Sequence, residues 1–212
     1  MVNKPFIKIC GITRKSDLKC VLNEGADAVG FIAFPKSPRY TSPQEMKFIL
    51  DHVDCRNCLK VAVFVNEDLN EVNKYLKAGA DIVQLHGDET AEFASSIDAE
   101  VWRAIRLNDE AQIAQYKDFP CSKFLIDSFV KDSEIPGGTG HVANWALAKK
   151  FVESVDKEVL LAGGITERNI EEALSEVKPF GFDLSSGVES CPGIKDHQKI
   201  KDLFTAVSAL VR

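Results

Sequence analysis

Short apolar, β-branched runs alternate with longer amphipathic stretches along the whole chain. Eight runs have the length and composition of buried strands, and they cover residues 6–10, 28–33, 59–65, 82–86, 101–106, 124–127, 159–162 and 182–185. Between and after them, apolar residues recur at helical spacing near residues 15–24, 43–52, 68–78, 89–97, 109–117, 142–155, 167–176 and 196–210. Gly25, Gly79 and Gly181 lie just before strands, where helices end and the chain turns.

The regular alternation of strands and helices predicts parallel βαβ units, and eight such units can close on themselves. We therefore predict an α/β fold in which residues 1–212 form a single (β/α)8 TIM barrel. An open doubly wound sheet is the competing architecture. No Gly-x-Gly-x-x-Gly sequence follows the first strand, whereas the last two units carry loops of the type that binds phosphate in barrels.

The two faces of the predicted strands indicate where an active site would lie. Successive side chains of a strand point to opposite sides, so Lys8 and Cys10 share a face that is too polar to pack against apolar helices. We expect such polar residues to point into the barrel near the C-terminal ends of the strands, where barrel active sites form. The set is Lys8, Cys10, Gln84, His86, Asp127, Asp183 and Ser185. The alternative is a hydrogen-bonded polar plug without function.

Glycine-rich loops follow the seventh and eighth predicted strands. Glycines let backbone N–H groups approach an oxyanion closely, and helix N-termini favour negative charge. Barrels commonly bind phosphate at these two loops. The predicted phosphate-binding residues are Gly163, Gly164, Ser185, Ser186 and Gly187.

The composition of the chain argues against some classes of function. Apolar residues make up 45% and charged residues 27% of the chain, and 26 basic against 32 acidic residues give a net charge of −6. This balance argues against a nucleic-acid partner. No apolar run approaches the ~20 residues that span a bilayer, so we expect no membrane association and a cytoplasmic location. Six cysteines then favour free thiols. Cys55 and Cys58 have redox or metal spacing, but zinc requires about four ligands.

Several motifs, taken together and in order, make the chain resemble the phosphoribosylanthranilate isomerases of tryptophan biosynthesis over essentially its whole length. They include Lys8-Ile9-Cys10-Gly11, Ser37-Pro38-Arg39-Tyr40, Gln84-Leu85-His86-Gly87, Leu125-Ile126-Asp127, Gly137-Gly138-Thr139-Gly140, Leu161-Ala162-Gly163-Gly164 and Asp183 through Glu189. The sequence departs from the family pattern after the sixth strand, where His141-Val142 replaces the common Lys-Thr. That departure bears on how this loop covers a substrate.

The resemblance implies an Amadori rearrangement of N-(5-phosphoribosyl)anthranilate to 1-(2-carboxyphenylamino)-1-deoxyribulose 5-phosphate, without cofactor or metal. It implies Cys10 as the general base, Asp127 as the general acid and Arg39 as the partner of the substrate carboxylate. The other residues that we expect to contact substrate are Lys8, Gln84, His86, Gly138, Gly140 and Asp183. The expected partner is a small phosphorylated substrate, bound by a monomer or homodimer.

This reaction requires a particular protonation state of each proton-transfer group. Asp127 would have to remain protonated near neutrality, and Cys10 would have to be partly thiolate, helped by a cation such as Lys8. The first and sixth strands of an eight-stranded ring lie roughly 13 Å apart, which leaves room for one furanose between their side chains. Lys8 could instead simply neutralise Asp183, and His86 could be a structural histidine.

Three other functions remain open at this stage. An indole-glycerol-phosphate synthase would bring an extended N-terminal segment, whereas about five residues precede the first predicted strand. A ribulose-phosphate epimerase would need metal-binding histidines, and the chain has four histidines in total. A non-catalytic barrel that binds a phosphorylated ligand would not need both Cys10 and Asp127.

Overall fold

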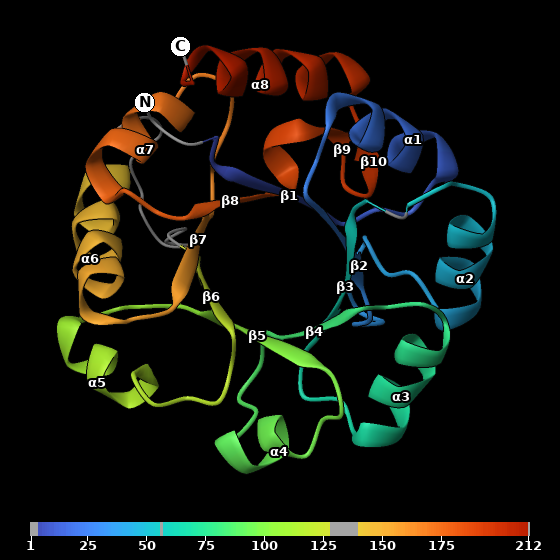
Figure 1. Cartoon of the computed structure of the whole chain (residues 1–212), viewed down its shortest axis with the longest axis horizontal. Helices are drawn as coiled ribbons and strands as arrows, with labels where there is room; N and C mark the ends of the chain where they lie inside the picture. Colours follow the sequence, from blue (N-terminus) through green and yellow to red (C-terminus); the bar gives the residue numbers. More distant parts are fainter. Residues whose placement is uncertain (1–3, 56, 128–139, 212) are drawn as a thin grey trace.

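Eight parallel strands close into a barrel in which each strand lies beside the strand that follows it in sequence (Figure 1). The computed structural model describes residues 4–55, 57–127 and 140–211. Pairing of the first strand with the eighth closes the ring and confirms the predicted barrel. The strands are Phe6–Cys10 (β1), Ala28–Ile32 (β2), Leu59–Phe64 (β3), Ile82–Leu85 (β4), Glu100–Ile105 (β5), Lys123–Asp127 (β6), Glu158–Ala162 (β7) and Gly181–Leu184 (β8).

The helices form a ring outside the barrel (Figure 1). Six lie close to the predicted positions, and the fourth and fifth are shorter than predicted. Ser95 and Ser96 at the end of the fourth helix return hydrogen bonds to carbonyl groups of the preceding turn, which competes with further helix. The helices are Lys15–Glu24 (α1), Pro43–Asp51 (α2), Leu69–Lys77 (α3), Ala91–Ser95 (α4), Ile113–Tyr116 (α5), Gly140–Ser154 (α6), Ile170–Val177 (α7) and His197–Ala209 (α8), with a 3-10 turn at Glu110–Gln112 (η1) before α5.

A small hairpin after β8 was not predicted. A 3-10 turn, Ser186–Val188 (η2), leads into the antiparallel strands Glu189–Cys191 (β9) and Ile194–Lys195 (β10). These strands are too short to produce a recognisable alternation in the sequence. The hairpin lies beside the first strand of the barrel, close to α1 (Figure 1).

The hydrophobic core has two layers, as the alternating strand faces require. The larger layer fills the space between the strands and the helices, and the smaller one fills the inside of the barrel. Trp102 is completely buried in the inner layer, and its ring lies 6.1 Å from that of Phe6. These large rings fill the barrel at the level where its strands begin. The open space that remains lies towards the C-terminal ends of the strands.

The connection between β2 and α2 is held firmly, and this connection carries Arg39. The Thr41 hydroxyl donates to the Ile12 carbonyl at 3.0 Å, and the Tyr75 hydroxyl donates to the Thr41 carbonyl at 2.7 Å. Ser42 and Glu45 form a reciprocal capping box that fixes the start of α2. The loop is therefore anchored to two neighbouring units of the barrel.

Candidate active site

A cavity of about 330 Å³ opens at the C-terminal ends of the barrel strands. It is lined by side chains and loops from β1, β2, β3, β4, β6, β7 and β8, so it has the position that barrel active sites occupy. Most of the predicted site residues lie in its wall. They are Cys10, Arg39, Gln84, His86, Asp127, Gly163, Gly164, Asp183, Ser185, Ser186 and Gly187.

Lys8 lies beneath this cavity and is not part of its lining. Its side chain is completely buried, and its ammonium donates to Asp183 Oδ1 at 2.8 Å. The register of β1 and β8 places the two residues side by side. Burial opposes the charge on Lys8, but Asp183 and Cys10 together raise its pKa above the ordinary value. Lys8 therefore forms an ion pair with Asp183, and its predicted contact with substrate stays a prediction.

Cys10 ends β1, two residues after Lys8, whose ammonium favours the thiolate form of the Cys10 side chain. Burial is the largest influence on the thiol and raises its pKa, although Lys8 and Lys195 both act in the opposite direction. The cation expected beside Cys10 is present, but burial outweighs it, so the pKa of the thiol lies above its ordinary value.

Asp127 ends β6 and reaches the same cavity from across the barrel. Its side chain is 23% exposed, and Arg106 Nε lies 3.8 Å from Asp127 Oδ2. His86, which follows β4, also lies in the cavity wall. Burial lowers the pKa of His86, despite the opposing effect of Asp127, and so favours the neutral imidazole. Among the described residues, His86 Nε2 and Gln84 Oε1 are buried without a hydrogen-bond partner.

The loops after β7 and β8 form the end of the cavity near α7. Gly163 and Gly164 have φ angles of +85° and +69°, a conformation that favours glycine. A Cβ atom on Gly187 would lie 2.1 Å from the Ile165 carbonyl oxygen, so the two loops are in contact. Within the described chain, the amide N–H groups of Gly164, Ser186 and Gly187 have no acceptor. The arrangement suits an oxyanion.

Arg39 is held by Glu189, which in turn is bound by Lys195, and we had predicted no role for either residue. Arg39 Nε lies 2.9 and 3.1 Å from the two oxygens of Glu189, and Nη2 lies 2.6 Å from Oε2. Lys195 donates to Glu189 Oε1 at 2.9 Å. The motif that contains Glu189 was visible in the sequence, but nothing in that motif indicated a contact with Arg39, because the two residues are 150 positions apart.

Two predicted substrate contacts cannot be placed in this cavity. Gly138 lies outside the described residues, and Gly140 is the first residue of α6, of whose opening turn only the backbone is described.

Cys55 and Cys58 are buried free thiols in the connection before β3, at the opposite end of the barrel from the cavity. In the part of the chain that the structure describes, no cluster of three or more His, Cys, Asp or Glu could hold a metal ion. No described helix is long and apolar enough to cross a membrane.

Comparison with known proteins gives a consistent result. Residues 7–206 match the family described as N-(5'phosphoribosyl)anthranilate (PRA) isomerase. The N-(5'-phosphoribosyl)anthranilate isomerase of Aquifex aeolicus is 40% identical over 200 residues, which cover 93% of this chain and 96% of that protein.

Two solved structures extend the comparison. One is a phosphoribosyl anthranilate isomerase in complex with reduced 1-(o-carboxyphenylamino)-1-deoxyribulose 5-phosphate. It is 32% identical, has a TM-score of 0.83, and the match covers 97% of this chain and 100% of that chain. The other shows monomers generated from the dimeric enzyme of Thermotoga maritima, with 32% identity, a TM-score of 0.81 and the same coverage. The chain therefore belongs to the N-(5'-phosphoribosyl)anthranilate isomerase family.

Proposed function

We propose that this chain isomerises N-(5'-phosphoribosyl)anthranilate in tryptophan biosynthesis, with Cys10 as the general base and Asp127 as the general acid. The observation that carries these roles is that both side chains line one cavity. They come from β1 and β6, which are separated by β7 and β8 around the ring. The cavity can thus hold a sugar between a thiol and a carboxyl group. We place this activity in the cytoplasm, in a monomer or homodimer.

The reaction begins at the ribose ring oxygen. Asp127 donates a proton to this oxygen, the bond from it to C1 breaks, and the anthranilate nitrogen forms a C1=N iminium. The Cys10 thiolate then removes the proton from C2, which gives an enolamine and the thiol. A proton moves from the C2 hydroxyl to C1 as the ketone forms, so C2 is oxidised and C1 reduced. The electrons balance within the substrate, and no external oxidant is required.

The raised pKa of Cys10 is compatible with this order of events. The thiol can release its proton to solvent after the ring opens, because the positive iminium that forms beside it stabilises the thiolate. That charge makes the C2 proton more acidic and favours the thiolate. The charge of Lys8 supports the same ionisation. We therefore assign the main ionisation of Cys10 to the complex with substrate.

Other residues of the cavity wall would bind the phosphate, the carboxylate and the sugar hydroxyls of the substrate. The loop amides of Gly164, Ser186 and Gly187 would bind the phosphate, with Gly163 and Ser185 beside them. Arg39, at another part of the wall, would bind the anthranilate carboxylate with the N–H groups that Glu189 does not occupy. His86 and Gln84 line the region between, and their buried atoms without a partner among the described residues would bind the sugar hydroxyls.

An activity assay tests the proposal. Phosphoribosylanthranilate is formed by condensing anthranilate with ribose 5-phosphate, and its fluorescence is followed after the protein is added. We expect the fluorescence to fall much faster than by spontaneous breakdown, with no added metal and at the same rate in the presence of a chelator. A protein that binds the compound without consuming it would be a non-catalytic barrel and would overturn the proposal.

A further inference from the structure

Glu189 and Lys195 meet on one face of the hairpin that follows the second loop of the cavity. They are cross-strand partners in the antiparallel register of β9 and β10. Their side chains are only 4% and 0% exposed. The turn between the strands contains Gly193 at φ +83°, and its amide also donates to Glu189 Oε1 at 3.3 Å. The hairpin thus brings a buried ion pair against Arg39.

Glu189 is saturated with donors, whereas Arg39 is not. The Glu189 carboxylate accepts from Arg39, from Lys195 and from the Gly193 amide. In the described structure, Arg39 Nη1 has no acceptor, and the residue lines the cavity. The stem of Arg39 lies against Gly11, where a Cβ atom would be 2.8 Å from Arg39 Cδ. Arg39 is therefore held in place with part of its guanidinium still available to a ligand.

The charges of the cluster formed by Arg39, Glu189 and Lys195 do not cancel. Arg39 and Lys195 contribute two positive charges and Glu189 contributes one negative charge, so the cluster carries a net charge of +1. The neighbouring pair, Lys8 and Asp183, is neutral as a whole. Burial lowers the pKa of Lys195, and the Glu189 carboxylate, 2.9 Å from its ammonium, works against that lowering. A buried charge without a counter-ion is costly, so a ligand that supplies one negative charge gains by binding here.

We propose that Arg39, Glu189 and Lys195 select for one carboxylate on the aromatic ring of the substrate, and that Lys195 supplies the excess positive charge. The inference rests on the proposed function and deepens it. Without Lys195, Glu189 would neutralise Arg39 completely, and a carboxylate would meet a neutral pair. Lys195 does not line the cavity. It is a specificity-determining residue that acts through Glu189 and Arg39.

The test measures binding of two stable ligands by calorimetry. One is reduced 1-(o-carboxyphenylamino)-1-deoxyribulose 5-phosphate, and the other is the same compound made from aniline, which lacks the ring carboxylate. The ratio of their Kd values is the carboxylate preference of the protein. Turnover is not needed, so an inactive protein can still show the preference. The activity assay on the wild type then reports separately on the proposed function.

Lys195→Met should lower the carboxylate preference about tenfold, while the aniline compound keeps its affinity within about threefold. Lys195→Gln, which keeps a hydrogen-bond donor but removes the charge, should lose the preference as well. Glu189→Gln should retain the preference, because Arg39 then lacks an internal counter-ion. The double variant Glu189→Gln with Lys195→Met returns the cluster to a charge of +1, so its preference should return to within about threefold of wild type.

Lys47→Met is the matched control, since Lys47 pairs with Asp51 on the exposed face of α2. It should change neither Kd. Thermal unfolding of each variant shows whether it is folded. The inference is overturned if Lys195→Met keeps the wild-type preference, or if the double variant is as impaired as Lys195→Met alone. The second result would mean that Lys195 holds the hairpin in place and has no electrostatic role.

Discussion

Gly30 lies opposite Cys10 on the neighbouring strand of the barrel, and its missing side chain leaves the space that the thiol occupies. The pair is in register between β1 and β2. A Cβ atom on Gly30 would lie 2.6 Å from Cys10 Sγ and 3.2 Å from Lys8 Nζ. The position of the proposed base thus depends on a glycine in the adjacent strand.

Gly30→Ala should displace the Cys10 sulfur and lower kcat at least ~10-fold, because a small misplacement of a reacting group is costly. Steady-state kinetics of the purified variant measures the effect. Gly25→Ala is the control, since no atom lies within 4 Å of its Cβ position. Gly25 has a φ of +89°, so this variant should lose about 1 kcal/mol of stability and keep its kcat. A kcat within twofold of wild type for Gly30→Ala would contradict the positional role.

The pH dependence of kcat/KM follows from the raised pKa of Cys10. The base acts as a thiolate, and kcat/KM reports ionisations of the free enzyme. A raised pKa means that the thiolate forms only as the pH rises above the ordinary thiol range, so kcat/KM should keep rising with pH well above neutrality. Lys195 favours the thiolate, so Lys195→Met should move this rise to still higher pH. A flat profile above neutrality would exclude Cys10 as the titrating base.

The contact between the two glycine-rich loops gives a test of the phosphate site. Gly187→Ala would press a methyl group against the Ile165 carbonyl oxygen and push the loops apart. We expect KM to rise about tenfold and inhibition by inorganic phosphate to weaken to a similar extent. Gly25→Ala again serves as the control and should leave both constants unchanged. Unaltered phosphate inhibition in Gly187→Ala would place the phosphate elsewhere.

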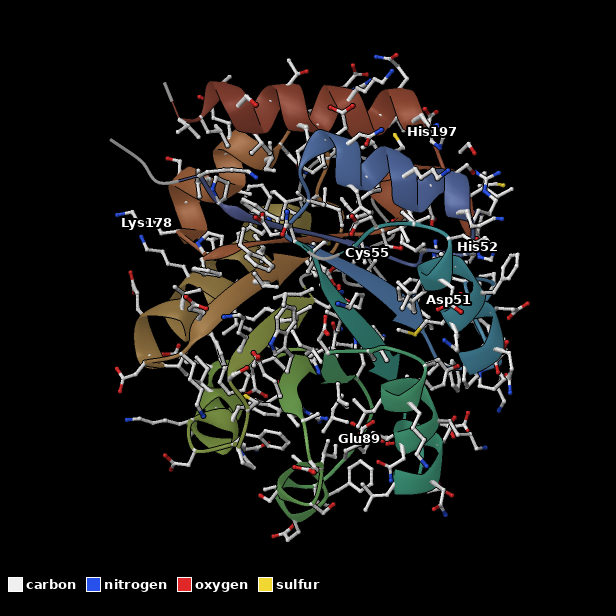
Figure 2. All side chains as sticks on the ribbon, turned by 45° about the vertical axis from the view of Figure 1, so that its right-hand side comes forward. Asp51, His52, Cys55, Glu89, Lys178 and His197 are labelled. Atoms are coloured by element: carbon white, nitrogen blue, oxygen red, sulfur yellow. The ribbon has the colours of Figure 1, made fainter. Side chains whose placement is uncertain are left out.

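A buried carboxylate outside the cavity anchors α1 to α8. Asp17 is completely buried and binds Arg14 at 2.8 Å and His197 at 2.9 Å. Figure 2 shows His197 at the end of α8 that lies nearest to α1. Burial would raise the pKa of Asp17, but the hydrogen bonds from Arg14 and His197 prevail and lower it. The ionised form therefore stabilises the folded state.

Asp17→Asn should cost about 2 kcal/mol in the free energy of unfolding at neutral pH, because the charged hydrogen bonds to Arg14 and His197 are lost. A lowered folded pKa contributes stability above the unfolded value of about 3.9, and this contribution is lost as the pH falls through the folded pKa. The difference between wild type and variant should thus shrink below about pH 4. Urea unfolding measures it, with the exposed Asp51→Asn as a control of little effect. A difference in unfolding free energy that is the same at neutral pH and below about pH 4 would contradict a lowered pKa for Asp17.

Much of the barrel was predictable because its signals are local. Each buried strand shows as a short apolar run, and the alternation within a strand indicates which side faces inward. Cys10, Gln84, His86, Asp127 and Asp183 follow from this rule, and they line the cavity or its edge as predicted. The loops after β7 and β8 follow from their glycines.

The features that could not be predicted depend on contacts between distant parts of the chain. Glu189 and Lys195 lie in a hairpin too short to give a pattern, and Arg39 meets them only after the barrel closes. The Cys10 pKa depends on the balance between burial and two lysines, one of which belongs to that hairpin. The sequence shows which charged residues are present, but it does not show how deeply each is buried, and burial determines which influence on the pKa is largest.

The kcat of Cys10→Ala and Asp127→Asn, measured with phosphoribosylanthranilate generated in situ, tests the central claim most directly. Because a positioned acid or base contributes at least ~10²-fold, each variant should lose that much in kcat while remaining folded. Cys20→Ala and Asp51→Asn, which change the same residue types outside the cavity, should keep the wild-type rate. Near-wild-type turnover by Cys10→Ala and Asp127→Asn would show that a sulfur and a carboxyl group can share this cavity without carrying the reaction.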